Sequence, residues 1–459
     1  MGDRYDAVVI GTGQAGPALA VRLAKAGRKT AIIERKRFGG TCVNNGCVPT
    51  KTLIASARAA HVARTGGAFG VVVPPGVEVD MPAVKARKDR VVQASRDGVR
   101  DWLKSTPGVT VIEGHARFEG PHTVRVGDAR LEAPQIFVNV GGRASVPPLT
   151  GIGDVPHLDN SSMMEIDSLP RHLVVVGGSY IGLEFAQMYR RFGAKVTVVE
   201  MMPALIARED PEVSAAIKDI LEAEGITIRL KAECLAVRRQ GDGIAVGVEC
   251  DEEPREIVGS HLLLATGRRP NTDDLGCEHA GIALDKRGYI VVDDLLQTNV
   301  AGIWALGDVN GRGAFTHTSY NDCEIVAANV LDGETRRVTD RIPTYALFID
   351  PPLGRAGMTE REVRDKGVNA LVATMPMTRV GRARERGVTA GFMKVLVDAD
   401  TGRLLGAALL GIEGDEVIHT LLDVMYARAP YTVIQRAMHI HPTVSELIPT
   451  LLEGLEPLK

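Results

Sequence analysis

One pattern occurs twice in the chain, and this repeat restricts the fold more than any other feature. Residues 5–34 read YDAVVIGTGQAGPALAVRLAKAGRKTAIIE, and residues 172–200 read HLVVVGGSYIGLEFAQMYRRFGAKVTVVE. Each copy has an apolar run, a glycine turn, an amphipathic stretch, a further glycine, a second apolar run and a final Glu. This order predicts a βαβ unit with parallel strands. Two copies so far apart predict two separate α/β nucleotide-binding domains rather than a solenoid.

The first glycine turn has the spacing of a dinucleotide-binding fingerprint. Gly11, Gly13 and Gly16 form G-x-G-x-x-G directly after the first apolar run. Glycines there allow a tight turn, a close approach to a pyrophosphate and close packing of helix on strand. Glu34 ends the second run and is placed to accept a hydrogen bond from a ribose hydroxyl. The competing interpretation is a glycine-rich turn of an α/β domain without a ligand.

The second glycine turn departs from this spacing at one position. Gly177 and Gly182 keep their places, whereas Ser179 stands where the middle glycine is expected. Glu200 closes the unit, and its carboxylate would repel a 2′-phosphate, which favours NADH over NADPH. The nearest following arginine, Arg208, is too far along the chain to offset this repulsion. The alternative interpretation of Glu200 is a solvated strand end.

Composition and charge argue against several classes of protein. The chain has 459 residues, which predicts several domains. Its formal net charge is -3 and its aromatic content is 4%, so we expect no nucleic acid and no anionic membrane as partner. No apolar run approaches the length of a membrane span, and the N-terminal residues lack the pattern of a signal peptide. We therefore expect a cytoplasmic protein.

Two cysteines lie close together in GGTCVNNGCVPTK, residues 39–51. In a regular helix, Cys42 and Cys47 would be separated by a rise of about 7.5 Å. That exceeds the Cα separation of about 4.4–6.8 Å that a disulfide allows. They can bond only if the backbone between them is irregular, and residues 44–46, Asn-Asn-Gly, tolerate irregular dihedrals. Pro49 suits the first turn of a following helix, whose start stabilises a thiolate.

Three interpretations of this pair compete. A zinc site or an iron–sulfur cluster needs about four ligands, and Cys234, Cys250, Cys277 and Cys323 are scattered, so we expect no metal site. Two buried, inert thiols are the simplest alternative. A redox disulfide is favoured because the pair directly follows a nucleotide-binding unit, and close cysteines in the cytosol are more often catalytic or metal-binding than structural.

The chain resembles the pyridine nucleotide–disulfide oxidoreductases of the glutathione reductase, dihydrolipoamide dehydrogenase and mercuric reductase type. The resemblance rests on the cysteine motif, both fingerprints and the segments ATGRRPN, ALGD and HIHPTVSE, in family order over nearly the whole chain. GAFTHTSYNDCEIVAANVL resembles the mercuric reductase branch. The resemblance implies an α/β fold with two Rossmann-like dinucleotide-binding domains and a C-terminal α+β dimerisation domain. The implied segments are 1–143 (FAD-binding, first part), 144–267 (NAD(P)-binding), 268–335 (FAD-binding and central) and 336–459 (dimerisation).

The resemblance also implies which residues bind cofactors. FAD belongs at the first fingerprint, and NADH, or less favourably NADPH, at the second. Asp308 of ALGD would bind the ribityl chain, and Thr41 would lie against the FAD phosphates. Asn139-Val140-Gly141 departs from the usual Ala-Thr-Gly of the family. The full set of implied cofactor-binding residues is Gly11, Gly13, Gly16, Glu34, Gly40, Thr41, Lys51, Gly141, Asp308, Gly177, Tyr180, Gly182, Glu200 and Gly267.

The redox roles follow from the same resemblance. Cys47 would face the flavin ring and Cys42 would exchange with substrate. Lys51 would sit near the reactive flavin nitrogen and pair with Glu184, because a buried lysine needs an anion and its charge favours reduced flavin. Tyr180 would cover the nicotinamide pocket. Two surface charges on separate helices are the alternative for Lys51 and Glu184, and a core aromatic is the alternative for Tyr180.

The last motif implies an acid–base pair shared between subunits. His441 would exchange protons with thiols, and Glu446 would fix its tautomer. In the family these residues reach the other subunit, which implies a homodimer. Taken alone, His441 is a capping or surface histidine, and we assign His439 a structural role.

Three functions are compatible with these residues. The first is an FAD-dependent NAD(P)H oxidoreductase that exchanges electrons between a Cys42–Cys47 disulfide and a small disulfide or dithiol. The second is a mercuric reductase-like reductase of a metal ion or electrophile, with the thiols as soft ligands. His441, where mercuric reductases typically carry Tyr, and a tail without cysteine argue against Hg(II). The third, a non-enzymatic redox sensor, would not need Lys51, Glu184, His441 and Glu446.

Overall fold

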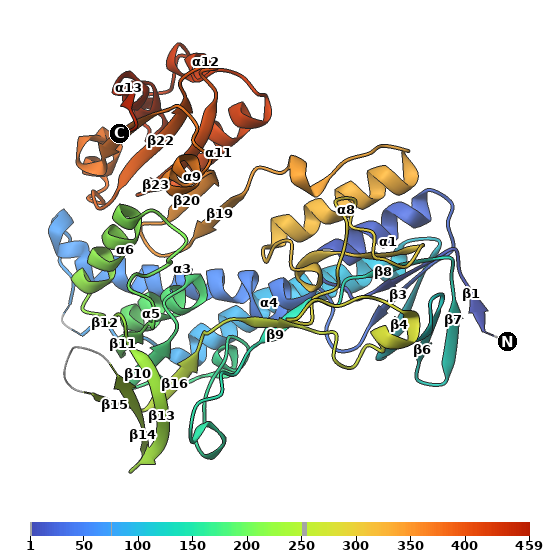
Figure 1. Cartoon of the computed structure of the whole chain (residues 1–459). Coiled ribbons are helices and arrows are strands. Elements are labelled where there is room, and N and C mark those ends of the chain that lie inside the picture. Colours follow the sequence, from blue (N-terminus) through green and yellow to red (C-terminus); the bar gives the residue numbers. More distant parts are fainter. Residues whose placement is uncertain (1, 75, 250–254) are drawn as a thin grey trace.

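The computed structural model describes residues 2–74, 76–249 and 255–459, and these residues build two parallel sheets and a larger antiparallel sheet (Figure 1). The parallel sheets belong to the two predicted βαβ units, and the antiparallel sheet lies in the C-terminal part of the chain. The predicted fold class, two dinucleotide-binding folds followed by a C-terminal α+β domain, is therefore confirmed.

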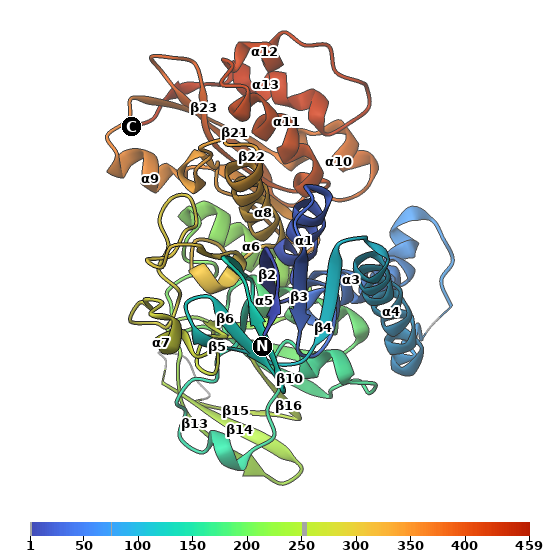
Figure 2. The ribbon, with the colours of Figure 1, turned by 90° about the vertical axis from the view of Figure 1, so that its right-hand side faces the viewer.

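The first parallel sheet has the strand order β18-β8-β2-β3-β4, with every neighbouring pair parallel. Its central strand β2 is buried throughout, in one apolar core with residues of α1 and α8 and with Phe118, Val124 and Leu131 of a neighbouring small sheet. The helices α1 and α8 pack side by side against it, although they lie far apart in sequence (Figure 2). The elements are β2 (Ala7–Ile10), α1 (Ala15–Lys25), β3 (Thr30–Glu34), β4 (Val109–Glu113), β8 (Gln135–Val138), β18 (Ile303–Ala305) and α8 (Thr316–Leu331).

A small sheet of order β1-β7-β6-β5 flanks this domain. The alternating segment 109–126 predicts paired strands, and β5 and β6 do pair antiparallel. The first part of this segment, β4, does not belong to the small sheet, because it pairs parallel to β3 in the five-stranded sheet. As an edge strand, β4 is half exposed, which gives it the same alternation as a hairpin strand. The strands are β1 (Asp3–Arg4), β5 (Ala116–Gly120), β6 (Thr123–Val126) and β7 (Ala129–Glu132).

The second α/β unit has the parallel order β12-β11-β10-β16 and carries an antiparallel sheet of order β13-β14-β15. Its helix α5 is buried along most of its length, including the charged residue Glu184. The elements are β10 (His172–Val176), α5 (Tyr180–Phe192), β11 (Lys195–Val199), α6 (Pro211–Ala223), β12 (Thr227–Arg229), β13 (Glu233–Gln240), β14 (Gly243–Glu249), β15 (Glu256–Gly259) and β16 (His261–Leu264).

A two-stranded ribbon joins the two α/β units. Strand β9 (Gly142–Ala144) leaves the first unit, β17 (Arg268–Pro270) returns to it, and the two pair antiparallel. Hydrogen bonds from Ser145 N to Gly267 O (3.0 Å) and from Asn271 N to Gly141 O (3.0 Å) extend the ribbon at both ends. Both glycines have positive φ, 65° at Gly141 and 128° at Gly267, where a side chain would be strained.

The C-terminal domain is a six-stranded antiparallel sheet of order β19-β20-β23-β22-β21-β24. Residues 391–411, GFMKVLVDADTGRLLGAALLG, predict two strands around an Asp-Thr-Gly turn, and the structure confirms them as β22 and β23. The tail, residues 416–455, has a helical sequence pattern. This prediction is only partly right, because residues 436–444 contain no helix and β24 rejoins the sheet. Pro430 and Pro442 interrupt helical hydrogen bonding here. The strands are β19 (Thr344–Leu347), β20 (Leu353–Gly357), β21 (Ala370–Pro376), β22 (Phe392–Asp398), β23 (Leu404–Leu410) and β24 (Glu456–Pro457).

The remaining helices connect or cover these sheets. The α-helices are α2 (Gly40–Asn45), α3 (Cys47–Thr65), α4 (Met81–Ser105), α7 (Cys277–Ala280), α9 (Glu360–Asp365), α10 (Gly381–Glu385), α11 (Gly414–Tyr426), α12 (Thr432–Gln435) and α13 (Ile448–Glu453). Short 3-10 turns occupy Gly66–Phe69, Ile152–Asp154, Ser162–Glu165, Gly307–Asn310, Val338–Asp340, Met377–Arg379 and Ser445–Leu447. Among the described helices, none combines the length and the apolar character that crossing a membrane requires.

Candidate active site

The two cysteines lie where helices α2 and α3 meet. Gly46 separates the helices with φ −129° and ψ −119°, so the backbone between the cysteines is irregular, as a disulfide between them requires. Pro49 falls in the first turn of α3, where its missing N–H costs no helical hydrogen bond. Cys42 is half-buried and Cys47 is exposed, and both are thiols in this structure.

The two thiols differ strongly in acidity. The pKa of Cys47 is lowered to about 6, chiefly because Cys42 hydrogen-bonds to it, although burial opposes this shift. Thr316, whose Oγ1 lies 3.1 Å from Cys47 Sγ, and the charge of Lys51 lower it further. The same contact with Cys47, together with burial, raises the pKa of Cys42. The contacts of the pair therefore favour the thiolate at Cys47 over the thiolate at Cys42.

Lys51 and Glu184 form the predicted ion pair. Lys51 Nζ on α3 lies 2.7 Å from Glu184 Oε2 on α5, and the Glu184 side chain is only 5% exposed. The second carboxylate oxygen accepts a hydrogen bond from Phe348 N at 3.1 Å, and Lys51 Nζ lies 4.3 Å from the centre of the Phe348 ring. The burial of Glu184 excludes the alternative of two surface charges. Both α/β units and the C-terminal domain thus meet at Lys51.

The first glycine turn has no room for side chains. A Cβ at Gly11 or Gly16 would overlap the carbonyl oxygen of Asn139 or of Gly11, respectively. A Cβ at Gly40 would lie 2.7 Å from Gly13 Cα. The glycine turn and the start of α2 can therefore approach this closely only because both positions are glycine. Bare backbone N–H groups at the start of α1 and next to Thr41 make a cradle that fits a dinucleotide pyrophosphate. Such a cradle is what FAD would require.

The acidic residues assigned to FAD lie around this cradle. Glu34 accepts hydrogen bonds from Thr12 N (3.1 Å), Thr12 Oγ1 (2.5 Å) and Lys36 N (2.8 Å), which fixes its carboxylate at the end of β3. Asp308 is half-buried, and burial raises its pKa while Arg268, 3.5 Å away, opposes the rise. These positions fit a ribose hydroxyl and a ribityl chain.

The second glycine turn repeats the same packing with one difference. A Cβ at Gly177 would lie 2.5 Å from Ala265 O, and one at Gly182 would overlap Gly177 O. Ala265 thus takes the backbone role that Asn139 has in the first unit, where the Asn139 amide also approaches Gly11 O at 3.4 Å. Asn139, where the family usually has Ala, therefore adds an amide side chain beside the first glycine turn. The backbone contact of the turn is the same as at Ala265 in the second unit.

The carboxylate of Glu200 faces the second turn. It accepts hydrogen bonds from Gly178 N at 2.6 Å and Met202 N at 2.8 Å. Glu200 is therefore part of the turn itself rather than a freely solvated strand end. Ser179, in place of the middle glycine, precedes α5 and forms no side-chain cap.

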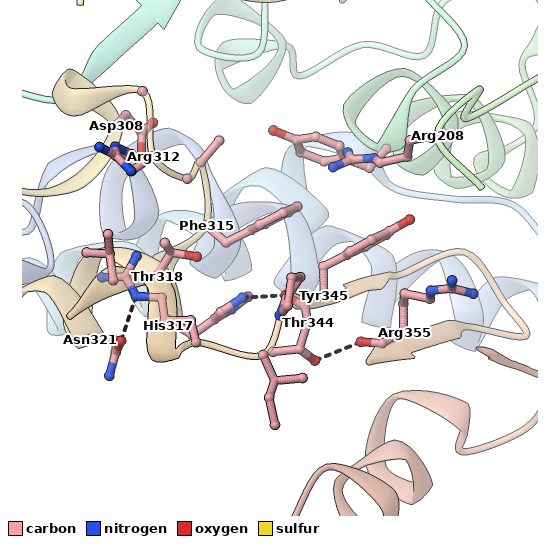
Figure 3. Close-up of a pocket in the computed structure, with 18 of the residues that line it drawn as sticks. Arg208, Asp308, Arg312, Phe315, His317, Thr318, Asn321, Thr344, Tyr345 and Arg355 are labelled. Carbon is pink, nitrogen blue, oxygen red and sulfur yellow. Dashed lines mark hydrogen bonds between the residues drawn. The ribbon is translucent and has the colours of Figure 1, made fainter. Parts of the chain in front are cut away.

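A cavity of about 730 Å³ opens between the second α/β unit, the residues after β18 and the C-terminal domain (Figure 3). Tyr180 and Phe315 line it with ring centres 5.4 Å apart, and Phe315 stacks on Tyr345 at 5.7 Å and on His317 at 5.3 Å. Arg208 also lines this cavity.

Sequence reasoning missed the contributions of Phe315, Thr316 and Tyr345, because their partners lie far away along the chain. Cys47 and Thr316, for example, are 269 positions apart. The available signal was the position of Phe315 and Thr316 at the start of a helix shortly after ALGD, a motif already assigned to the flavin.

His441 and Glu446 contact each other on the C-terminal domain. His441 Nδ1 lies 3.0 and 3.1 Å from the two carboxylate oxygens of Glu446, which orients the ring. The His441 side chain is 81% exposed, and His441 lies in the segment that joins α12 to α13. These two helices lie at the outer end of the C-terminal domain, away from α3 (Figure 1). Its neighbours Met438 and Ile440 are also exposed, at 99% and 79%. The pair therefore does not reach the cysteines of its own chain.

The chain belongs to the pyridine nucleotide–disulfide oxidoreductases of class I. Residues 5–323 match the family pyridine nucleotide-disulphide oxidoreductase, and residues 343–452 match the dimerisation domain of that family. The family uses FAD and NAD(P)H, and each of the two glycine cradles described above would suit one dinucleotide. The predicted family, oxidoreductase class and cofactors are confirmed.

Several relatives resemble the chain over almost its whole length. The probable pyridine nucleotide-disulfide oxidoreductase RclA of Escherichia coli is 38% identical, over 97% of this chain and 98% of the relative. The mercuric reductase of Streptomyces lividans is 33% identical, over 97% and 94%. A solved structure described as the HOCl-induced flavoprotein disulfide reductase RclA superposes with a TM-score of 0.90, at 37% identity and 98% and 99% coverage. The same protein in a Cu(II) complex gives a TM-score of 0.89, at 37% identity and 97% and 99% coverage.

Proposed function

We propose that the chain is an FAD-dependent NADH:disulfide oxidoreductase in which Cys42 and Cys47 form the redox disulfide. The observation that carries this proposal is the placement of two adjoining thiols where α2 meets α3, with Cys47 Sγ 3.1 Å from Thr316 Oγ1. Cys42, Thr316 and Lys51 lower the pKa of Cys47, whereas contact with Cys47 and burial raise the pKa of Cys42. A thiolate next to the buried Lys51–Glu184 pair suits a sulfur that faces a flavin, and a protonated partner suits the sulfur that meets substrate.

The proposed coenzyme is NADH rather than NADPH. The Glu200 carboxylate is fixed beside the phosphate turn by two backbone N–H groups. A fixed negative charge there repels a 2′-phosphate and can accept a hydrogen bond from a 2′-hydroxyl.

The reaction then balances as two thiol–disulfide exchanges. FAD, held at the first glycine turn, would supply the transfer of two electrons between NADH and the disulfide. In the reduced pair, Cys47 is the thiolate and Cys42 is the thiol. Cys42 gives its proton to a base and attacks one sulfur of the substrate disulfide, which releases the first thiol with that proton. The Cys47 thiolate attacks Cys42 in the mixed disulfide, restores the internal disulfide and expels the second sulfur as a thiolate, which takes a proton from water. The reverse sequence oxidises a dithiol.

We propose that the base is the partner's His441, in a homodimer. The raised pKa of Cys42 means that this thiol needs a base at neutral pH. His441 is oriented by Glu446 and exposed among apolar residues, on a domain whose family is defined by dimerisation. Burial of Met438 and Ile440 by a second copy would stabilise such a dimer.

A second candidate function is reduction of a metal ion or an electrophile at the same cysteines. It is favoured by the relatives described as mercuric reductase and as a Cu(II) complex. Two adjacent thiols are soft ligands for such an ion. A sensor without catalysis is disfavoured, since it would need neither the Lys51–Glu184 pair nor the His441–Glu446 pair.

The test is an anaerobic titration of the flavin-loaded protein with NADH. We expect a long-wavelength charge-transfer band with one equivalent, which Cys47→Ser abolishes. If no band forms and Cys47→Ser changes nothing, both candidate functions are wrong. Turnover with oxidised glutathione, lipoamide, Hg(II) and Cu(II) then separates the two candidates.

The dimer is tested by mixing two inactive variants. Cys42→Ser chains retain His441, and His441→Gln chains retain both cysteines. Random reassembly places one complete site in each mixed dimer, so about a quarter of wild-type activity should return. If none returns although mixed dimers form, the base does not come from the partner subunit.

A further inference from the structure

Arg208 is an exposed arginine held in place only by aromatic rings. Its guanidinium carbon lies 4.6 Å from the ring centre of Tyr345, 5.7 Å from that of Tyr180 and 5.8 Å from that of Phe315. Figure 3 shows its side chain over the rings of Phe315 and Tyr345 at the cavity. Within the described parts of the chain, Arg208 makes no hydrogen bond or ion pair. Its N–H donors are therefore available to a ligand.

The segment that carries Arg208 packs directly on the second glycine turn. Ile206 N donates a hydrogen bond to Gly178 O at 3.0 Å. A Cβ added at Gly178 would lie 2.7 Å from Leu205 and 3.0 Å from Glu200, so this segment touches the turn at a glycine. Arg208 follows two residues after the anchored Ile206 and contacts Tyr180, the first residue of α5. A dinucleotide pyrophosphate in such a fold lies at this helix start.

The residues after Arg208 are fixed to the C-terminal domain. Tyr345 Oη donates a hydrogen bond to the buried carboxylate of Glu209, and Arg355 lies 3.4 Å from Glu209 and 3.6 Å from Asp210. Lys394 lies 3.5 Å from Asp210. The backbone at Arg208 is thus anchored on both sides, whereas its side chain is held only by weak cation–π contacts and can turn toward a phosphate.

We propose that Arg208 binds the pyrophosphate of the pyridine nucleotide, leaving the three aromatic rings for the phosphate oxygens when the nucleotide enters. A guanidinium suits this role because it forms two parallel hydrogen bonds to one phosphate. This inference rests on the proposed function, since it assigns a residue to the NADH site. Arg208 is distinct from the proposed determinant of the 2′-position, which is the Glu200 carboxylate hydrogen-bonded to Gly178 N.

The test compares ligands with and without the pyrophosphate. Dissociation constants of ADP-ribose and of adenosine are measured by calorimetry on the flavin-loaded protein. In R208M we expect the constant for ADP-ribose to rise about 5- to 50-fold, and the constant for adenosine to stay within about twofold. R208K should recover part of the loss, because a lysine keeps the charge without the fork.

Arg287 offers a matched control. It lines the same cavity and lies 5.1 Å from the ring centre of Tyr289, in a cation–π contact away from α5. R287M should leave the affinity for ADP-ribose within about twofold. The inference is overturned if R208M binds ADP-ribose as the wild type does, or if R287M loses as much affinity as R208M. If wild-type protein does not bind ADP-ribose at all, the proposed nucleotide site itself is wrong, which is a separate outcome.

Discussion

Replacing Thr316 by valine tests the origin of the thiolate at Cys47. The hydroxyl lies 3.1 Å from Cys47 Sγ, and valine keeps its shape without the donor. A hydrogen bond to a charged group contributes about 1.5–3 kcal/mol, and one pKa unit corresponds to about 1.4 kcal/mol. The pKa of Cys47 should therefore rise from about 6 to about 7 or 8.

The direction of the pH dependence follows from the lowered pKa. A thiol with a pKa of about 6 is roughly nine-tenths thiolate at pH 7, and the thiolate is lost as the pH falls through 6. In Thr316→Val, the thiolate at pH 7 should fall to between about a half and a tenth. The charge-transfer band of the two-electron-reduced holoenzyme, recorded between about pH 4.5 and 9, measures this titration directly.

Thr318→Val is the control, because Thr318 lies on the same helix and makes no hydrogen bond to either cysteine among the described residues. Its band should titrate as in the wild type. The reasoning fails if the midpoint in Thr316→Val moves by less than about 0.3 units, or if Thr318→Val moves it equally.

Three further predictions test other parts of the site. Glu184→Gln keeps the acceptor for Phe348 N but removes the anion beside Lys51. Reduction of the flavin by NADH, measured by stopped flow, should therefore slow by about tenfold or more. An unchanged rate would contradict the role of the Lys51–Glu184 pair. Gly182→Ala forces a Cβ against Gly177 O, so NADH binding should be lost while the flavin-to-protein ratio is unchanged; loss of flavin instead would show that the units are not independent. His441→Gln should lower disulfide turnover by about 10²–10³-fold and leave reduction by NADH within about twofold, and equal loss in both half-reactions would refute its assignment.

The local units of this fold could be predicted from the sequence because their determinants are contiguous. Gly11 and Gly16 and their counterparts in the second unit must be glycines, because a Cβ at these positions would overlap neighbouring backbone. The spacing of these glycines can be recognised in the sequence alone. The Cys42–Cys47 pair and the irregular residue between them are equally local. Buried strands such as β2 and β10 are continuous apolar runs, and the glycine turn that follows each run indicates a parallel sheet.

The rest depends on contacts between distant segments. Alternation in 109–126 could not distinguish an edge strand from a hairpin, because both are exposed on one side. Thr316 acquires its importance only when α8 is placed against α3, and Arg208 only when β19 is placed beside α5. The resemblance supplied the pairing of Lys51 with Glu184, which no spacing rule gives. The boundaries drawn between the domains remain predictions.

The antiparallel ribbon of β9 and β17 has a consequence for how this enzyme class can change its coenzyme. The chain leaves the first α/β unit through β9 and returns to it through β17, so the segment between these strands is attached at one place. The two strands are hydrogen-bonded to each other there. Such an inserted domain can be replaced at the ribbon by a homologous domain without changing the connections between the strands of the first α/β unit. Recombination at this junction would therefore transplant coenzyme preference as a cassette, provided that the contacts of the insertion with the rest of the chain are matched. These include the Lys51–Glu184 pair, the Arg191–Asp350 pair and the ion pairs at Glu209 and Asp210.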